Sequence, residues 1–235
     1  MTAETTQPSR AVRKRERTRD TLLTAMQLCL LEKGYEKTNI SDLTEQADVG
    51  LGTFYNYYDS KADILAAVIQ LVLRNYHLEV DQVTAGLEDP AERLAASMHY
   101  TFNLFCDTAG FSKLLFESGV PLELYANDIR ERAKQDMQAG IDKNRFQVND
   151  LMITLNMITG STLYSGADLY RGNMAPSAIP KIIENFLLLV GMSSAEAKRI
   201  SQIEYPLPAK TRFPISLIAL NERERELKGQ LNEQP

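Results

Sequence analysis

Apolar residues recur along this chain at helical spacing, and polar breaks separate the apolar stretches. The first stretch lies within residues 12–33, where Leu22, Met26, Cys29 and Leu30 occupy the i, i+4, i+7 and i+8 positions of one helix face. Gly34 follows, and glycine is the residue type most common just beyond a helix end. The pattern therefore predicts a helix over residues 12–33 with one buried face.

Two short helices are expected next. Asn39 followed by Asp42 has the residue types of a capping-box variant, which places a helix at residues 40–47. A second helix is expected at 51–57, after a turn that requires positive φ and that Asp48 tolerates, as a second choice after Gly or Asn. Two short helices joined by about three residues form a helix-turn-helix.

The rest of the chain also has the spacing of helices. Asp89 ahead of Pro90 is a typical helix start, and no stretch alternates apolar and polar residues as a strand would. Residues 204–214 are expected to be an extended connector. Residues 215–230 are either a frayed helix or a tail that contacts a partner. The remaining helices are expected at residues 61–84, 90–108, 111–118, 121–143, 148–171, 176–191 and from Ser193 or Ser194 to 203.

Charge is distributed unevenly along the chain. Its net charge is −5, but residues 10–19 hold six basic residues against Glu16, which leaves −10 for the remainder. A basic arm on an acidic body suits contact with phosphates or with an anionic surface. The alternative is a solvated, disordered tail.

Several function classes lack their usual sequence features. Cys29 and Cys106 lie far apart without a CxxC motif, which argues against a disulfide scaffold and a zinc site. No run approaches the roughly 20 apolar residues of a membrane span, so we expect a cytoplasmic protein that does not contact membranes. With two histidines and no HExxH, GxSxG, P-loop or Gly-rich dinucleotide turn, we expect neither an enzyme nor a cofactor. A membrane-surface module would need a broad basic amphipathic face, and apolar positions are sparse before Leu22.

Residues 34–65, GYEKTNISDLTEQADVGLGTFYNYYDSKADIL, resemble the DNA-binding domain of the TetR family of bacterial regulators. Asp48 stands where the family usually has Gly, and Gly50 where it usually has Ser or Thr. The second change removes a possible hydroxyl contact to phosphate, which a backbone N–H can replace. The matched positions are Gly34, Tyr35, Thr38, Ile40, Asp42, Leu43, Ala47, Val49, Gly52, Thr53, Tyr55, Tyr57, Lys61 and Leu65.

The resemblance implies an all-α fold, in which a three-helix DNA-binding domain precedes a larger helical domain for ligand binding and dimerisation. The expected divisions are a disordered basic arm at 1–11, the helix-turn-helix domain at 12–60, the effector-binding and dimerisation domain at 61–203, and a C-terminal extension at 204–235. The implied function is a sequence-specific transcriptional regulator, a repressor released from a palindromic DNA operator by a small, mostly apolar effector.

The segment 51–58 carries the candidate base contacts. Phe54 and Tyr58 share one face and are expected to pack inward, which leaves their neighbours for DNA. Asn can hydrogen-bond adenine at two points, Thr and Tyr can reach phosphate, and glycine lets the backbone approach a surface closely. The alternatives are that Tyr55 and Tyr57 pack against the first helix and that Lys61 is merely solvated. The expected DNA-binding residues are Arg13, Arg17, Thr38, Gly52, Thr53, Tyr55, Asn56, Tyr57 and Lys61.

The helix at 176–191 is apolar nearly all round, so it must be buried on two sides. With the helix before it, it resembles the family's dimer-forming pair, so a homodimer is expected; the alternative is burial within one subunit. The expected interface residues are Leu155, Leu163, Ile179, Ile183, Phe186, Leu187 and Val190. Family analogy places the effector pocket within 90–170, although each candidate there also fits a core position. The candidates are Met98, Phe102, Phe105, Phe116, Tyr125, Met152, Asn156 and Tyr164.

Overall fold

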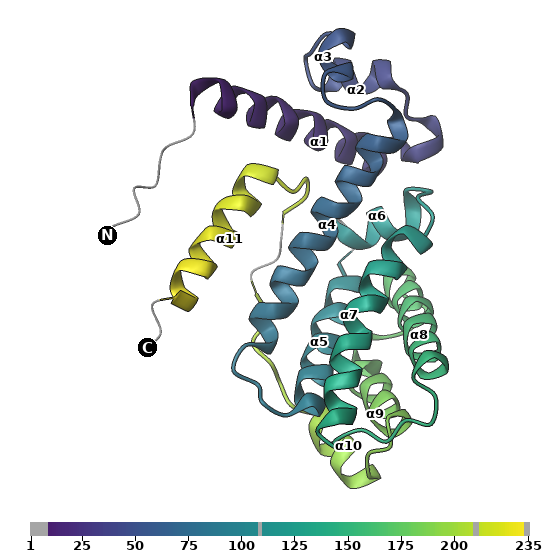
Figure 1. Cartoon of the computed structure of the whole chain (residues 1–235). Helices are drawn as coiled ribbons and strands as arrows, with labels where there is room; N and C mark the ends of the chain where they lie inside the picture. Colours follow the sequence, from purple (N-terminus) through teal and green to yellow (C-terminus); the bar gives the residue numbers. More distant parts are fainter. Residues whose placement is uncertain (1–8, 108–109, 209–211, 233–235) are drawn as a thin grey trace, which may run out of the picture. The chain divides into compact units, whose positions relative to one another are not determined.

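A computed structural model describes residues 9–107, 110–208 and 212–232. Its secondary structure is helical, with no strand among these residues, which confirms the all-α fold. The chain divides into two units, of which one combines Met1–Val72 with Arg212–Pro235 and the other is Leu73–Thr211. Figure 1 shows the helices in chain order. Helix α4 (Lys61–Thr84) runs from the first unit into the second.

The first unit holds the predicted helix-turn-helix. Helix α1 (Arg10–Lys37) leaves the helical conformation at Gly34, where φ is 78°, so the predicted end at glycine is confirmed although the chain turns helical again up to Lys37. The predicted apolar face of α1 is buried. Helices α2 (Ile40–Gln46) and α3 (Leu51–Tyr55) follow, and α11 (Leu217–Asn232) returns to this unit from the far end of the sequence.

Two boundaries of the expected division differ from the structure. The C-terminal extension was expected as a segment of its own, but its residues from Arg212 onward belong with the N-terminal residues. Most of the expected disordered arm, residues 1–8, lies outside the described residues. Its last part is ordered, because Ser9 caps α1 by accepting a hydrogen bond from the Val12 amide and Arg10 begins the helix. The basic stretch 10–19 is therefore helical.

The second unit is a bundle of helices around an aromatic core. Its helices are α5 (Pro90–Phe105), α6 (Phe111–Glu117), α7 (Glu123–Asp142), α8 (Leu151–Arg171), a 3-10 turn (Pro176–Ala178), α9 (Ile179–Leu189) and α10 (Ser194–Ser201). Several ends differ from the prediction: α8, for example, begins three residues later than predicted, because Asp150 accepts a hydrogen bond from the Ile153 amide and caps the helix there.

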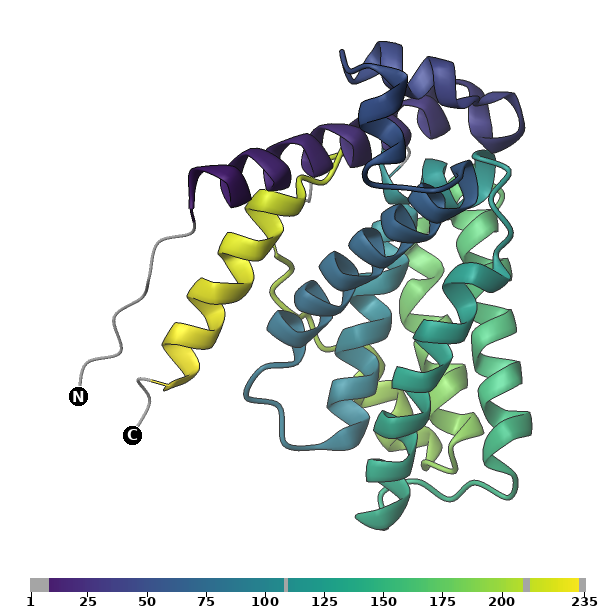
Figure 2. The ribbon, with the colours of Figure 1, turned by 45° about the horizontal axis from the view of Figure 1, so that its top comes forward.

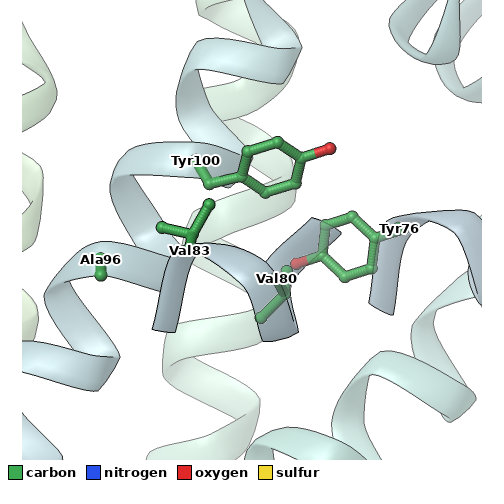
Figure 3. Close-up of a cluster of buried hydrophobic side chains, with 5 residues drawn as sticks. All are labelled: Tyr76, Val80, Val83, Ala96 and Tyr100. Carbon is green, nitrogen blue, oxygen red and sulfur yellow. The ribbon is translucent and has the colours of Figure 1, made fainter. Parts of the chain in front are cut away.

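Helices α4 and α5 meet through a cluster of buried side chains. Tyr76, Val80 and Val83 of α4 pack against Ala96 and Tyr100 of α5, as Figure 3 shows. The rings of Tyr76 and Tyr100 lie 6.0 Å apart, a separation typical of favourable aromatic pairs. This cluster fixes the part of α4 that enters the second unit.

Candidate nucleic-acid interface

The start of α2 is fixed by a complete capping box. The Asp42 amide donates to the Asn39 side chain at 2.9 Å, and the Asn39 amide donates to the Asp42 carboxylate at 2.9 Å. Lys33 of α1 pairs with the same carboxylate at 2.6 Å. The Lys33 hydrogen bond, with help from the Asn39 amide, holds the pKa of Asp42 below its ordinary value. The capping box predicted from the sequence is confirmed.

The turn between α2 and α3 has the predicted conformation. Asp48 has a φ of 50°, which reverses the chain, and the Val49 amide donates to the Thr44 carbonyl at 3.0 Å. Gly50 then precedes α3 without a side-chain cap, so the first amides of α3 have no hydroxyl partner from that position. Because Phe54 and Tyr58 are buried as expected, α3 is anchored by one face only.

The opposite side of α3 is exposed. Tyr55 keeps 51% of its side chain accessible, Gly52 and Asn56 are also exposed, and Thr53 is half-buried. A methyl group placed on Gly52 would meet no atom of the chain within 4 Å. Four of the expected DNA-binding residues therefore share one uncharged, open surface, which we call the α3 face.

One residue of this surface was not predicted. Leu51, the first residue of α3, exposes about half of its side chain. Helical spacing could not have found it, because Leu51, Phe54 and Tyr58 occupy the i, i+3 and i+7 positions of one face, which predicts a buried leucine. An exposed leucine next to polar groups suits contact with a thymine methyl group.

Tyr57 is not part of the α3 face and lies instead beside a basic residue of α1. The guanidinium of Arg15 lies 6.0 Å from the centre of the Tyr57 ring, so Tyr57 is half-buried beside α1. This geometry matches the packing alternative for Tyr57 and leaves part of its ring accessible. Arg13 and Arg17 are both exposed on α1.

Two expected contact residues serve the fold instead. Thr38 is 1% exposed, and its hydroxyl donates to the Gly34 carbonyl at 2.7 Å. The Lys61 ammonium donates to the carbonyls of Tyr35 at 3.1 Å and Thr38 at 3.0 Å, and it lies 4.2 Å from the centre of the Tyr35 ring. The expectation that Thr38 and Lys61 present their side chains to DNA is therefore corrected, because both side chains secure the end of α1.

Replacing Lys61 with Ala is expected to lower the free energy of unfolding by about 1–3 kcal/mol, because two carbonyls lose their charged donor. Urea denaturation followed by circular dichroism measures this change. Lys61→Arg, which keeps donors at the same position, serves as the comparison. Equal stability of the Ala variant and the unaltered protein would contradict this structural role.

The second unit contains two adjoining cavities of about 70 and about 50 Å³. Both are lined by Tyr76, Met98 and Thr101, and the Tyr76 and Thr101 hydroxyls are hydrogen-bonded at 2.8 Å. The larger cavity reaches Arg132 and Asp136. Burial is the main cause that raises the pKa of the Asp136 carboxyl above its ordinary value. The smaller is lined mainly by apolar side chains, with a few threonines. Together they form the candidate effector cavity.

The structure places only part of the expected effector set at this cavity. Met98 and Phe105 line it. Phe102 and Tyr125 are buried but do not line either cavity, and Phe116 packs on the ring of Tyr170 at 5.6 Å. The expectation is corrected for three residues whose side chains point outward on α8: Met152, Asn156 and Tyr164. Tyr76 was not predicted as a lining residue because it lies on α4, outside residues 90–170, where the pocket was expected.

The expected dimer residues pack within the chain. Phe186, for example, stacks on Phe102 with ring centres 6.3 Å apart, and Leu163 lines the smaller cavity. Burial within one subunit accounts for six of these side chains, so their assignment to an interface is corrected, whereas Leu163 is only half-buried. The six buried residues are Leu155, Ile179, Ile183, Phe186, Leu187 and Val190.

A different surface of α8 is apolar and open. Ile153 and Met157, one helical turn apart, expose 59% and 51% of their side chains, and Tyr164 exposes 79%. Gly160 lies between them, and a methyl group there would meet no atom of the chain within 4 Å. This exposed stripe, with Met152, is called the α8 face.

Among the described residues, no cluster of His, Cys, Asp and Glu is arranged to hold a metal ion. In the same part of the chain, no helix combines the length and the apolar character needed to cross a membrane.

Comparison with known protein families shows which families the two parts of the chain match. Residues 22–68 match the model of bacterial regulatory proteins of the tetR family, and residues 89–202 match the model of the tetracyclin repressor-like C-terminal domain. The chain belongs to the TetR family. The first matched segment contains the helix-turn-helix, and the second contains α5 to α10.

Named TetR-family relatives are transcriptional regulators. The repressor NemR of Escherichia coli (strain K12) is 31% identical over 128 residues, which is 54% of this chain and 60% of NemR. The regulator HbdR of Aromatoleum sp. (strain CIB) is 34% identical over 79 residues, 34% of each chain. The matched part thus spans between about a third and three fifths of the length of these relatives.

Solved TetR-family structures match over more of the chain. RolR without ligand is 27% identical with a TM-score of 0.62, covering 81% of this chain and 99% of RolR. RolR in complex with resorcinol is 28% identical with a TM-score of 0.65, covering 85% of this chain and 100% of RolR.

Proposed function

We propose that this TetR-family chain is a cytoplasmic, sequence-specific transcriptional repressor that binds a palindromic operator as a homodimer and leaves it when a small effector binds. The observation that carries the proposal is the α3 face. It is an exposed, uncharged surface with an amide, a hydroxyl and a phenol, held by one buried side of a helix-turn-helix. Such groups read base edges and phosphates in the major groove.

Affinity for the DNA backbone has a separate source. The α3 face carries no formal charge, so phosphate neutralisation falls to the basic end of α1, where Arg13 and Arg17 are exposed. Binding carried by phosphate contacts weakens steeply with salt. We therefore propose that the neutral α3 face reads the DNA sequence and that the basic end of α1 supplies the affinity for the phosphate backbone.

Gel-shift assays with genomic duplex fragments, repeated at rising salt, test this function. We expect retention of a small set of fragments and a steep fall of affinity with salt. Binding to anionic liposomes but not to duplex DNA would contradict the proposal and favour a membrane-surface module.

The α8 face supports dimerisation. Monomeric proteins rarely leave a contiguous apolar patch open to water without an interaction to cover it, and a two-fold axis would place the same stripe of two copies in contact. A central glycine allows two such helices to approach closely. A dimer also supplies the second α3 face that a palindrome requires.

The candidate effector cavity favours a small ligand. Its walls are mostly apolar, with the Tyr76 and Thr101 hydroxyls at the junction of both parts. RolR, with its bound resorcinol, suggests a hydroxylated single-ring compound as the first probe. Release of DNA requires only that the ligand binds the DNA-incompetent state more tightly.

Replacing Thr101 with Val is expected to weaken binding of resorcinol by about 1 kcal/mol, roughly fivefold in Kd, because one hydroxyl of the cavity is lost at nearly constant volume. Titration calorimetry measures the change. Binding of a ring without hydroxyl groups, such as toluene, serves as the control and is expected not to weaken. Equal loss for both ligands would contradict a polar role for Thr101.

A further inference from the structure

A fully buried glutamine joins the C-terminal segment to α1. Gln27 is 0% exposed. Its side-chain nitrogen donates to the Ile215 carbonyl at 2.9 Å, and its side-chain oxygen accepts from the Ile215 amide at 2.8 Å. Both backbone groups of one residue are thus paired by one side chain. Burial of an amide is favourable only when such partners are present, so this contact is specific.

A carboxylate of α1 caps the N-terminus of α11, which begins two residues after Ile215. Asp20 accepts hydrogen bonds from the Leu217 amide at 2.6 Å and the Ser216 hydroxyl at 3.1 Å. The Ser216 oxygen in turn accepts from the Ala219 amide at 3.2 Å. A negative charge at a helix N-terminus is favourable for both amides and dipole. Helix α11 therefore begins at a point set by α1.

Helix α11 then lies beside the basic half of α1, as Figures 1 and 2 both show. Between them is a groove of about 210 Å³. Its lining residues come from both helices and are Arg13, Glu16, Arg17, Ile218, Asn221, Glu222 and Arg225. The carboxylates in this groove offset part of the arginine charge.

The basic half of α1 needs such support. Its first turn contains no acidic residue, and arginines there oppose the helix dipole. Its residues are mostly exposed, and a short helical end without packing is marginal in water. The side chains that flank it from α11 supply packing and counter-charge.

We infer that Asp20 and Gln27 are positioning residues for DNA binding. They dock residues 213–232 on α1, and the docked α11 keeps Arg13 and Arg17 on an ordered helix where they meet DNA phosphates. The role for DNA rests on the proposed function. The docking itself is a property of the free protein and is tested separately.

Hydrogen exchange in the free, full-length protein tests the docking. In Asp20→Ala we expect amides of residues 10–21 to exchange about tenfold faster, because the α11 start loses its cap, while the buried part of α1 keeps its protection. Asp20→Asn retains one acceptor and should restore part of the protection. Glu32→Gln, which removes a charge from the exposed side of the same helix, is the control and should change nothing. Unchanged exchange in Asp20→Ala would overturn the inference.

The salt dependence of DNA binding tests the positioning role. A merely structural defect lowers the folded fraction and leaves the slope of log K against log salt unchanged. In Asp20→Ala, each protomer of the dimer loses two ordered arginines, so four phosphate contacts are lost and the slope should fall by about 3.6, at roughly 0.9 for each contact. A faster-exchanging α1 with an unchanged slope would overturn the positioning role. If the unaltered protein binds no duplex, the proposed function itself fails, and the exchange result still decides whether α11 orders α1.

Discussion

A Met157→Arg variant is expected to be a monomer that binds operator DNA about a hundredfold more weakly, because the second half-site loses its tether. Met157 lies in the middle of the exposed α8 face. A two-fold interface doubles every substitution, so two guanidinium groups would meet near the axis. Unpaired charges buried together cost several kcal/mol. Sedimentation velocity and DNA binding by anisotropy measure both effects.

Gln135→Arg adds the same charge to an exposed position of α7 and serves as the control. It should stay dimeric and bind DNA normally. A dimeric Met157→Arg protein would place the interface elsewhere than the α8 face.

A Gly52→Ala variant is expected to be more stable than the unaltered protein and yet to bind DNA worse. Alanine favours a helix over glycine by up to about 1 kcal/mol, and the added methyl group meets no atom of the chain within 4 Å. In the proposed complex with DNA, the same methyl group would stand where the backbone of α3 is expected to approach the groove. Affinity should fall about tenfold or more, as when one base contact is lost.

The matched control is Gly229→Ala on α11, where a methyl group also meets no neighbour. It should gain stability without losing DNA affinity. Thermal unfolding and anisotropy titrations on both variants give the comparison. If Gly52→Ala binds DNA as well as Gly229→Ala does, the α3 backbone does not approach DNA.

Features set by nearby residues were predictable from the sequence. The capping box of Asn39 and Asp42, the positive φ of Asp48 and the break at Gly34 each depend on one to four adjacent positions. The inward packing of Phe54 followed from helical spacing alone. Such features are determined by the chemistry of adjacent residues, so they can be predicted without knowing the tertiary contacts.

Features set by distant partners were not predictable. A polar residue such as Gln27 belongs on a helix surface by its type, and only Ile215, 188 positions away, explains its burial. Lys61 has donors that suit phosphate, but the carbonyls that bind it became visible only in three dimensions. An apolar pattern predicts that Ile183 is buried, but it does not specify whether residues of the same subunit or of a second copy cover it. The exposed Tyr164 of α8 shows the converse, because an aromatic residue that also fitted a core position remains open to solvent.

Selection of bound duplexes from a random DNA pool tests the central claim most directly, since it reports what the α3 face reads and how many copies bind. We predict recovery of an inverted repeat whose half-sites face one side of the duplex, about one helical turn or a multiple of it apart. Recovery of no preferred sequence, or of a single site without symmetry, would contradict a dimer that reads DNA through two copies of this surface.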